Sequence, residues 1–223
     1  MRRRLRPTPR RIAILLAATV GVGAGVGYAA SLSVGTWHLW AGSQTLTKGT
    51  CTLTGTTQST DTHVVQATPT TSFGTNTTLL VKSNSASQDW SFVRFDLSSC
   101  AIPTTGGADS ATLTLFITTA PASNRTLDVT PVLTTWSGTL TWNAAQALSY
   151  GSATTTFTTG TTSNTAKSAT VTVDVDALIK SSSANFGWRI NDANTGTSAT
   201  TTFASSENGT ASRRPQLVVN YEK

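Results

Sequence analysis

The sequence predicts an all-β protein built as an antiparallel sandwich or barrel. Many short runs rich in Thr, Val, Phe and Leu are separated by clusters of turn residues, at a spacing typical of these architectures. Polar and apolar residues alternate within the runs, as where Leu113 and Leu115 alternate with threonines, which indicates a sheet with one solvated face. Helix signals are almost absent, apart from a short turn that Asp176 can cap.

The predicted strands follow one another from residue 61 onward. Each run is short, and clusters of turn-forming residues such as Gly, Ser, Asn, Asp and Pro separate the runs. In chain order the runs are residues 61–66, 78–83, 90–98, 111–119, 126–134, 139–142, 154–159, 169–176, 186–191 and 200–205.

The C-terminal stretch, residues 203–221, is predicted to form two strands around a turn. Asn208 followed by Gly tolerates the positive φ that tight turns require. Pro215 begins the last strand, where it costs no hydrogen bond inside the sheet. Glu207 and Arg214 are expected to form an ion pair across the turn. The apolar residues expected on one face of the last strand are Leu217, Val219 and Tyr221.

The charge distribution argues against a nucleic-acid partner. The net charge is +6, but six of the 16 basic residues are arginines ahead of residue 12, which leaves ten basic and ten acidic side chains in the rest of the chain. Nucleic-acid binding depends on clustered Lys and Arg. The remainder of this sequence has no such cluster, so no nucleic-acid partner is predicted.

Residues 1–30 are predicted to be an export signal, because arginines precede an uncharged apolar run that ends in small residues. The alternative is an uncleaved anchor, since the run approaches the roughly 20 residues that span a bilayer. A membrane partner is expected only in that case. Residues 31–60 form a Thr/Ser/Gly-rich leader, and residues 61–223 the β-sandwich domain. The protein is therefore expected to be secreted or on the cell surface.

The two cysteines, Cys51 and Cys100, are expected to form a disulfide, because oxidising compartments favour pairing. The bond would tie the leader to the loop after the strand at residues 90–98. Two unpaired, buried thiols are the alternative. Two cysteines alone cannot build a metal site.

An ordered set of motifs gives this chain a family resemblance. The motifs are DTHVV, SFGTNTTLLVKS, FVRFDLSS, DSATLTLFIT, VTPVLTTWSGTLTWN, VTVDVDALI, NFGWRI, FASSE and RRPQLVVNY. In this order the chain, from about residue 61 to residue 221, resembles the DNRLRE-type domain family, which overlaps the alginate-binding carbohydrate-binding modules of family ninety-six. The resemblance implies a jelly-roll-like β-sandwich, bacterial export and a non-catalytic role. His63 and Gln146 depart from the residues usual in the family, Tyr and Pro.

The strand at residues 90–98 carries the candidate ligand-binding residues. Alternation places Val93, Phe95 and Leu97 on the face predicted to enter the core. The opposite face would present an aromatic-plus-arginine platform, because aromatic rings stack on sugars and arginine binds carboxylates in bidentate fashion. The alternative is that the aromatic residues pack under a loop while the arginine pairs with the aspartate or with a neighbouring strand. The platform consists of Trp90, Phe92, Arg94 and Asp96.

No enzyme activity is predicted. Asp174 and Asp176 would share a strand face about 6–7 Å apart, near the separation of paired glycosidase carboxylates, but Asp176 is better explained as a helix cap. The sequence has no His/Cys cluster of the kind that binds zinc. Structural calcium, with Asp61 and Asp192 as ligands, is the one cofactor left open.

The sequence thus favours an exported, non-catalytic carbohydrate-binding module whose partner is a polysaccharide, either a cell-wall or an acidic one. The alternative is a structural or adhesive cell-surface protein that makes protein contacts through the same sandwich. The sequence carries no enzyme domain beside the module, and this favours the structural or adhesive alternative more than usual.

Overall fold

Most of the strands form where β-branched and aromatic residues alternate with polar ones. The computed structural model describes residues 47–222, apart from residues 85, 182–183 and 195. The strands are β1 (Lys48–Thr54), β2 (Ser59–Val65), β3 (Thr78–Ser83), β4 (Asp89–Phe95), β5 (Ala108–Thr119), β6 (Thr126–Pro131), β7 (Thr155–Thr158), β8 (Thr165–Thr170), β9 (Trp188–Asp192), β10 (Ala199–Ala204) and β11 (Gln216–Glu222). The helices are η1 (Leu97–Ser99), α3 (Trp142–Gln146), α4 (Thr172–Ser181) and η2 (Ala211–Arg213).

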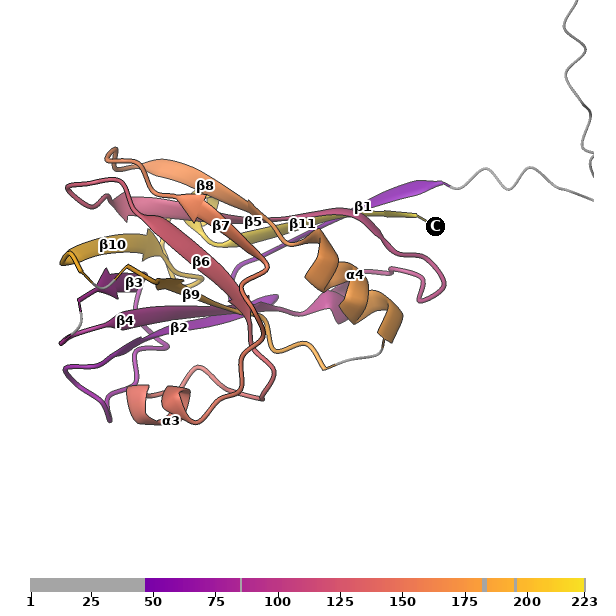
Figure 1. The fold of residues 1–223 in the computed structure, drawn as a ribbon. Helices are drawn as coiled ribbons and strands as arrows, with labels where there is room; N and C mark the ends of the chain where they lie inside the picture. Colours follow the sequence, from indigo (N-terminus) through magenta and orange to yellow (C-terminus); the bar gives the residue numbers. More distant parts are fainter. Residues whose placement is uncertain (1–46, 85, 182–183, 195, 223) are drawn as a thin grey trace, which may run out of the picture. The chain divides into compact units, whose positions relative to one another are not determined.

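The strands form one curled antiparallel sheet in the order β1-β11-β5-β10-β3-β4-β9-β6-β7, with β2 beside β4 and β8 beside β5. Figure 1 shows that the curl produces two layers, with β5, β8 and β11 in one and β2, β3 and β4 in the other. Two layers that each bury one face are the usual way for a sheet to cover its apolar side. The prediction of an all-β antiparallel sandwich is confirmed.

The main core lies between the layers and contains large side chains that are almost fully buried. Phe95, Leu113, Leu127, Phe203 and Leu217 are each at most 1% exposed. Burying one such side chain contributes about 1.5–3 kcal/mol.

A second apolar cluster lies on the outer side of β2 and β4. It is covered by residues 132–151, which include α3 and are called the strap below. The buried members of this cluster are Val64, Phe92, Val132, Trp136, Leu140, Trp142 and Ala145. The two tryptophans of the strap therefore serve packing.

The C-terminal stretch does not form the predicted pair of neighbouring strands. β10 pairs with β3 and β5, whereas β11 pairs with β5 and β1, so β5 lies between them. Gly209 does not have a positive φ. The predicted alternation in the last strand is confirmed, because Leu217, Val219 and Tyr221 are all buried.

The predicted ion pair between Glu207 and Arg214 is also wrong. Arg214 Nε donates a hydrogen bond of 2.8 Å to the carbonyl of Asn208. Glu207 instead accepts one of 2.9 Å from the Ser206 hydroxyl and lies beside the buried carboxyl of Asp61.

Two predicted strands do not form as strands over their whole length in the structure. The run at residues 139–142 leads into α3, whose first turn is capped by Thr141 accepting a 3.3 Å hydrogen bond from the Ala144 N–H. The run at residues 169–176 continues β8 only to Thr170, and α4 begins at Thr172 rather than after Asp176. Asp176 is therefore inside the helix and does not cap it.

The predicted leader, residues 31–60, contributes β1 and the beginning of β2 to the sheet. β1 pairs with β11 over its whole length, from Lys48 opposite Glu222 to Thr54 opposite Gln216. The predicted export signal and residues 31–46 lie outside the described residues. Between residues 47 and 222, apart from the gaps given above, no helix is long and apolar enough to cross a membrane.

The predicted disulfide between Cys51 and Cys100 is confirmed. Cys51 lies on β1 and Cys100 follows η1, so the bond joins an edge strand to the connection between β4 and β5. It closes a loop with a sequence separation of 49 residues.

Candidate functional site

β4 alternates as predicted, and this alternation places its side chains on two different clusters. Val93 and Phe95 enter the main core, and Leu97 packs against it. Trp90, Phe92 and Arg94 lie on the opposite face, toward the strap. The structure separates these three residues and does not leave them as one continuous platform.

Phe92 is fully buried, at 0% exposure, so it cannot belong to the exposed platform that was predicted. Its ring centroid lies 5.6 Å from that of Trp136 and 6.4 Å from that of Tyr150, both in the strap. The sequence alternative, in which an aromatic residue of this strand packs under a loop, describes Phe92. Its ring packs between the sheet and the strap.

Trp90 is half-buried and makes its ring contacts with other side chains. The Trp142 ring centroid is 4.5 Å away, and the guanidinium carbon of Arg189 lies 4.6 Å from the Trp90 centroid. Its indole N–H donates a 3.1 Å hydrogen bond to Gln88 Oε1. Trp90 therefore belongs to a packed group at one side of the strap.

Arg94 lies at the other side of the strap. Its guanidinium carbon is 5.3 Å from the centroid of the Trp136 ring, and Nη1 donates a 3.3 Å hydrogen bond to the Trp136 carbonyl. Among the described residues this is its one hydrogen bond, although guanidinium has five N–H donors. Arg94 does not form the ion pair with Asp96 that the sequence alternative considered, so donors remain for a ligand.

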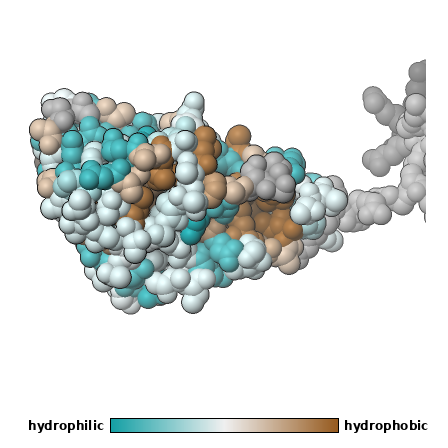
Figure 2. Space-filling view, turned by 90° about the horizontal axis from the view of Figure 1, so that it is seen from below, coloured by the Kyte–Doolittle hydropathy of each residue, from teal (hydrophilic) through white to brown (hydrophobic). Residues whose placement is uncertain are grey.

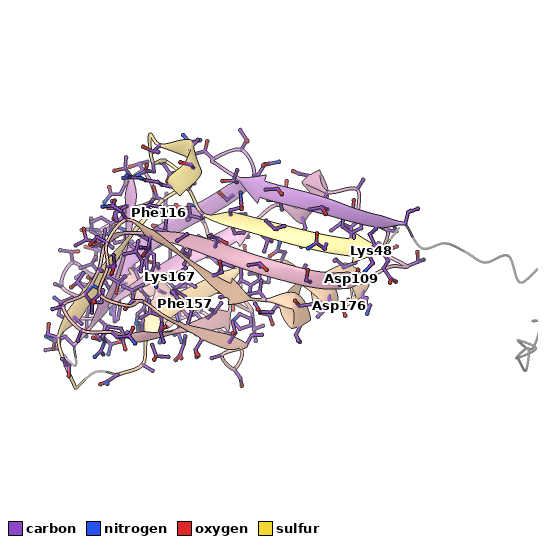
Figure 3. All side chains as sticks on the ribbon, turned by 90° about the horizontal axis from the view of Figure 1, so that it is seen from above. Lys48, Asp109, Phe116, Phe157, Lys167 and Asp176 are labelled. Carbon is purple, nitrogen blue, oxygen red and sulfur yellow. A yellow bond between two sulfur atoms is a disulfide. The ribbon has the colours of Figure 1, made fainter. Side chains whose placement is uncertain are left out.

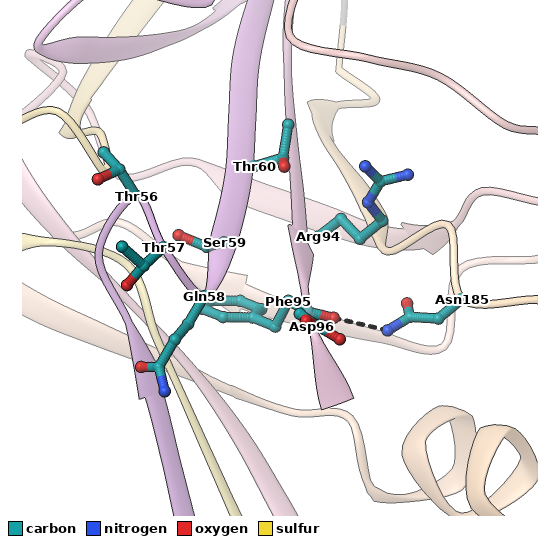
Figure 4. A pocket seen from close by; sticks show the side chains of 9 residues that line it. All are labelled: Thr56, Thr57, Gln58, Ser59, Thr60, Arg94, Phe95, Asp96 and Asn185. Atoms are coloured by element: carbon teal, nitrogen blue, oxygen red, sulfur yellow. Dashed lines mark hydrogen bonds between the residues drawn. The ribbon is translucent and has the colours of Figure 1, made fainter. Parts of the chain in front are cut away.

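A shallow groove of about 380 Å³ opens beside Arg94, between the turn that precedes β2 and the end of β4. Figure 4 shows Arg94, Asp96, Gln58 and Asn185 around this groove. The full lining is Thr56, Thr57, Gln58, Ser59, Thr60, Arg94, Phe95, Asp96 and Asn185. Hydroxyl, amide, carboxylate and guanidinium groups thus predominate.

The two amide side chains of the groove are held by backbone groups. Asn185 Nδ2 donates a 2.7 Å hydrogen bond to the Phe95 carbonyl, and its Oδ1 accepts one of 3.1 Å from the Gly187 N–H. Gly187 has φ +69°, and a Cβ there would lie 2.1 Å from the Val93 carbonyl oxygen. Only glycine allows this close approach, which places Asn185 against β4.

Asp96 lines the groove and also caps the short helix η1. Its carboxylate accepts hydrogen bonds of 3.0 Å from the Ser98 N–H and 2.6 Å from the Ser98 hydroxyl, capping η1. These hydrogen bonds lower the pKa of Asp96. The group is therefore a fixed, charged acceptor at the rim.

The groove can bind hydroxyl-rich ligands, because sugar hydroxyls both donate and accept hydrogen bonds. Sequence reasoning found Arg94 and Asp96 but missed Gln58, Asn185 and the threonines around them. Gly187 was a local signal for a close backbone contact, but nothing in the sequence indicated that its partner was β4. Figure 2 shows that the apolar areas on one face of the molecule are interrupted by hydrophilic and neutral residues.

The two aspartates considered for calcium do not form one site. Asp192 makes a buried ion pair with Arg125, at 2.6 Å between Oδ2 and Nε. Asp61 Oδ2 instead accepts a 2.7 Å hydrogen bond from the Ser206 N–H. No group of three or more His, Cys, Asp or Glu side chains suited to a metal ion occurs in the described part of the chain.

Asp174 and Asp176 do not share a strand face, since both lie in α4, where positions two apart point in different directions. Asp174 accepts hydrogen bonds of 2.6 Å from Trp188 Nε1 and 2.8 Å from the Thr154 hydroxyl. Asp176 pairs with Lys180 at 2.8 Å. The spacing expected for a catalytic carboxylate pair is therefore wrong.

Comparison with protein-family models matches residues 52–221 to carbohydrate-binding module family 96. Comparison with curated proteins finds no match. The matched segment extends from β1 to β11 and includes every residue that lines the groove. The carbohydrate-binding part of the family resemblance is thereby confirmed.

Proposed function

The chain belongs to carbohydrate-binding module family 96, and on that premise we propose that it binds an acidic or cell-wall polysaccharide in the groove beside Arg94, without catalysing its conversion. The observation that carries this proposal is the position of Arg94. Its guanidinium lies against the Trp136 ring at the edge of an open polar groove, with most of its donors unused among the described residues. Such a group suits a sugar carboxylate.

The rest of the groove supports recognition of a sugar chain. Asn185 and Asp96 are fixed by backbone hydrogen bonds, so ordering them on binding costs little entropy. Gln58 Oε1 accepts a 3.1 Å hydrogen bond from the Thr54 N–H, which holds this side chain at the opposite wall. The hydroxyls of Thr57 and Thr60 add groups that can exchange hydrogen bonds with a sugar.

We also propose that the protein acts outside the cytoplasm. The Cys51–Cys100 disulfide supports this, because disulfides persist in oxidising compartments. The apolar run at residues 12–30, with arginines before it, has the composition of an export signal. Mass spectrometry of the protein recovered from culture medium and from membranes would test export and cleavage together.

Affinity electrophoresis of the full chain through gels containing alginate, polygalacturonate, xylan or mannan tests the proposed function. We expect retardation in at least one acidic polysaccharide and a loss of about tenfold or more in affinity for R94Q, because charge-assisted hydrogen bonds are lost. R213Q is the matched control, since Arg213 lies over the Phe116 ring, outside the groove.

If R94Q and R213Q lost affinity for the polysaccharide equally, the net charge of the protein, and not the groove, would determine retention. If none of the four gels retards the wild type, and insoluble cell walls do not retain it either, the polysaccharide proposal is wrong. The structural or adhesive alternative would then be favoured.

A further inference from the structure

The connection between β10 and β11, residues 205–215, carries the one Asn-Gly pair of the sequence, Asn208–Gly209. Beyond the pair, the guanidinium carbon of Arg213 lies 5.1 Å from the centroid of the Phe116 ring on β5, which attaches this connection to the sheet (Figure 3). Asn208 is half-buried and Gly209 is exposed. The pair therefore stands at a turn that is anchored but open to water.

The side chain of Asn208 folds back over its own backbone. Its Oδ1 accepts a 3.0 Å hydrogen bond from the Thr210 N–H, the arrangement of an Asx-turn. This turn brings the amide carbon Cγ toward the nitrogen of Gly209. The hydrogen bond to Oδ1 also stabilises the negative charge that this oxygen gains when a nucleophile attacks Cγ.

The nitrogen of Gly209 is free to make that attack. Its N–H makes no hydrogen bond with the described residues. A Cβ added to Gly209 would meet no atom within 4 Å, and the residue does not have a positive φ. The fold therefore does not require glycine at this position, but the missing Cβ leaves the nitrogen unhindered.

We propose that Asn208–Gly209 is a site of spontaneous modification, at which Asn208 is converted to aspartate and isoaspartate with loss of ammonia. The Gly209 nitrogen forms a bond to Cγ of Asn208 and loses its proton. The Cγ–Nδ2 bond breaks, and the amide nitrogen takes up a proton and leaves as ammonia. Solvent water, the one co-reactant, then opens the cyclic imide at either of its carbonyl carbons, and nothing is oxidised or reduced.

Two other asparagines make the same turn and provide internal controls. Asn84 Oδ1 accepts a 3.0 Å hydrogen bond from the Ala86 N–H, and Asn194 Oδ1 accepts one of 3.1 Å from the Gly196 N–H. The residue that follows is Ser in one case and Thr in the other. Both carry a Cβ that crowds the attacking nitrogen, so these asparagines should react more slowly than Asn208.

The conversion should weaken the attachment of the connection. Asn208 Nδ2 donates a 3.2 Å hydrogen bond to the Thr77 carbonyl, whereas a carboxylate cannot donate and repels that oxygen. The new carboxylate would also follow Glu207, whose carboxyl group already lies beside that of Asp61. No residue that lines the groove is changed, so the inference is independent of the proposed function.

Peptide mass spectrometry of the full chain, incubated at pH 8 and 37 °C, tests the modification. The tryptic peptide of residues 190–213 contains both Asn194 and Asn208, so fragmentation compares the two in one molecule. We expect Asn208 to lose ammonia about tenfold faster than Asn194, with isoaspartate among the products, because its neighbour has no Cβ. G209A should remove this difference.

The proposed modification is overturned if Asn208 reacts no faster than Asn194, or if G209A reacts as fast as the wild type while urea unfolding shows that it is folded. N208D reproduces the aspartate product and should unfold at a lower urea concentration than the wild type. N164D is the matched control, because it adds the same charge at an exposed position. Equal stability of N208D and N164D would overturn the weakened attachment.

Discussion

Asp61 and Glu207 bring two carboxyl groups together inside the protein. Asp61 is 2% exposed, and one oxygen of each carboxyl group is buried without a hydrogen-bond partner among the described residues. Burial and the neighbouring Glu207 raise the pKa of Asp61 to about 8. Two carboxylates so close cannot both ionise easily, so Asp61 holds a proton at neutral pH.

This environment predicts a stability that falls as the pH rises. The folded pKa of Asp61 is above its unfolded value of about 3.9, so its contribution is complete below pH 4 and is lost as the pH rises through about 8. We expect the free energy of unfolding in urea to fall less between pH 5 and pH 9 for D61N than for the wild type, because the amide of Asn does not titrate.

D109N provides the control for this prediction, since Asp109 is in an ion pair at the surface with Lys48. It should keep the pH dependence of the wild type. If stability changed with pH in the same way for D61N and the wild type, the raised pKa of Asp61 would be contradicted. His63 acts in the opposite direction and at lower pH, because burial lowers its pKa to about 4.

Among the secondary-structure elements, α4 shows how tertiary packing decides between two sequence patterns. Val171, Val173 and Val175 alternate as in a strand, which is why a strand was predicted. Val171 and Val175 are fully buried, whereas Val173 is 73% exposed. Ile179 packs against the same core, so the spacing of four residues, typical of a helix, is the one that the core uses.

The two aspartates of α4 should therefore differ in a stability measurement. D174A removes the acceptor of Trp188 Nε1, and Trp188 is 2% exposed. Leaving this N–H unpaired should lower the free energy of unfolding by about 1–3 kcal/mol. D176A, in the same helix, should cost less, because its hydrogen bonds with Lys180 and with the Ala108 N–H are exposed or only partly buried.

Urea unfolding followed by tryptophan fluorescence measures both variants. An equal loss for the two would show that the Trp188 hydrogen bond has no special role. Neither variant should change polysaccharide retention, since neither residue lines the groove.

For the whole molecule, the Cys51–Cys100 disulfide connects the first described strand to the connection that precedes β5. A closed loop of this length restricts the unfolded chain and contributes about 4 kcal/mol. The double variant C51S/C100S should lose a large part of this stability in urea unfolding. Reduction of the wild type should have a similar effect, and the double variant should be insensitive to reductant.

Much of the strand content could be predicted because alternation is a local signal. The strand at residues 78–83 has the predicted bounds, and the faces of β4 and β11 are as expected. The pairing of the strands was harder to predict. β10 and β11 are neighbours in sequence, but β5 lies between them in the sheet.

The candidate site was predictable only in part for the same reason. Arg94 was placed on the outer face by its position in β4, but alternation could not tell which outer residues the strap would cover. The strap buries Phe92 and contacts Trp90, because its own tryptophans need an apolar surface. Asn185 and Gln58 reach the groove from distant parts of the chain.

The sequence by itself determined the all-β class, the family, the disulfide and the two faces of the main strands, because these depend on periodic pattern and on residue type. Only the tertiary structure decided which outer faces remain open, which alternating run became a helix, and which residues meet at the groove. Those outcomes depend on contacts between segments separated by many residues, and burial of apolar surface against a particular neighbour outweighs local preference there.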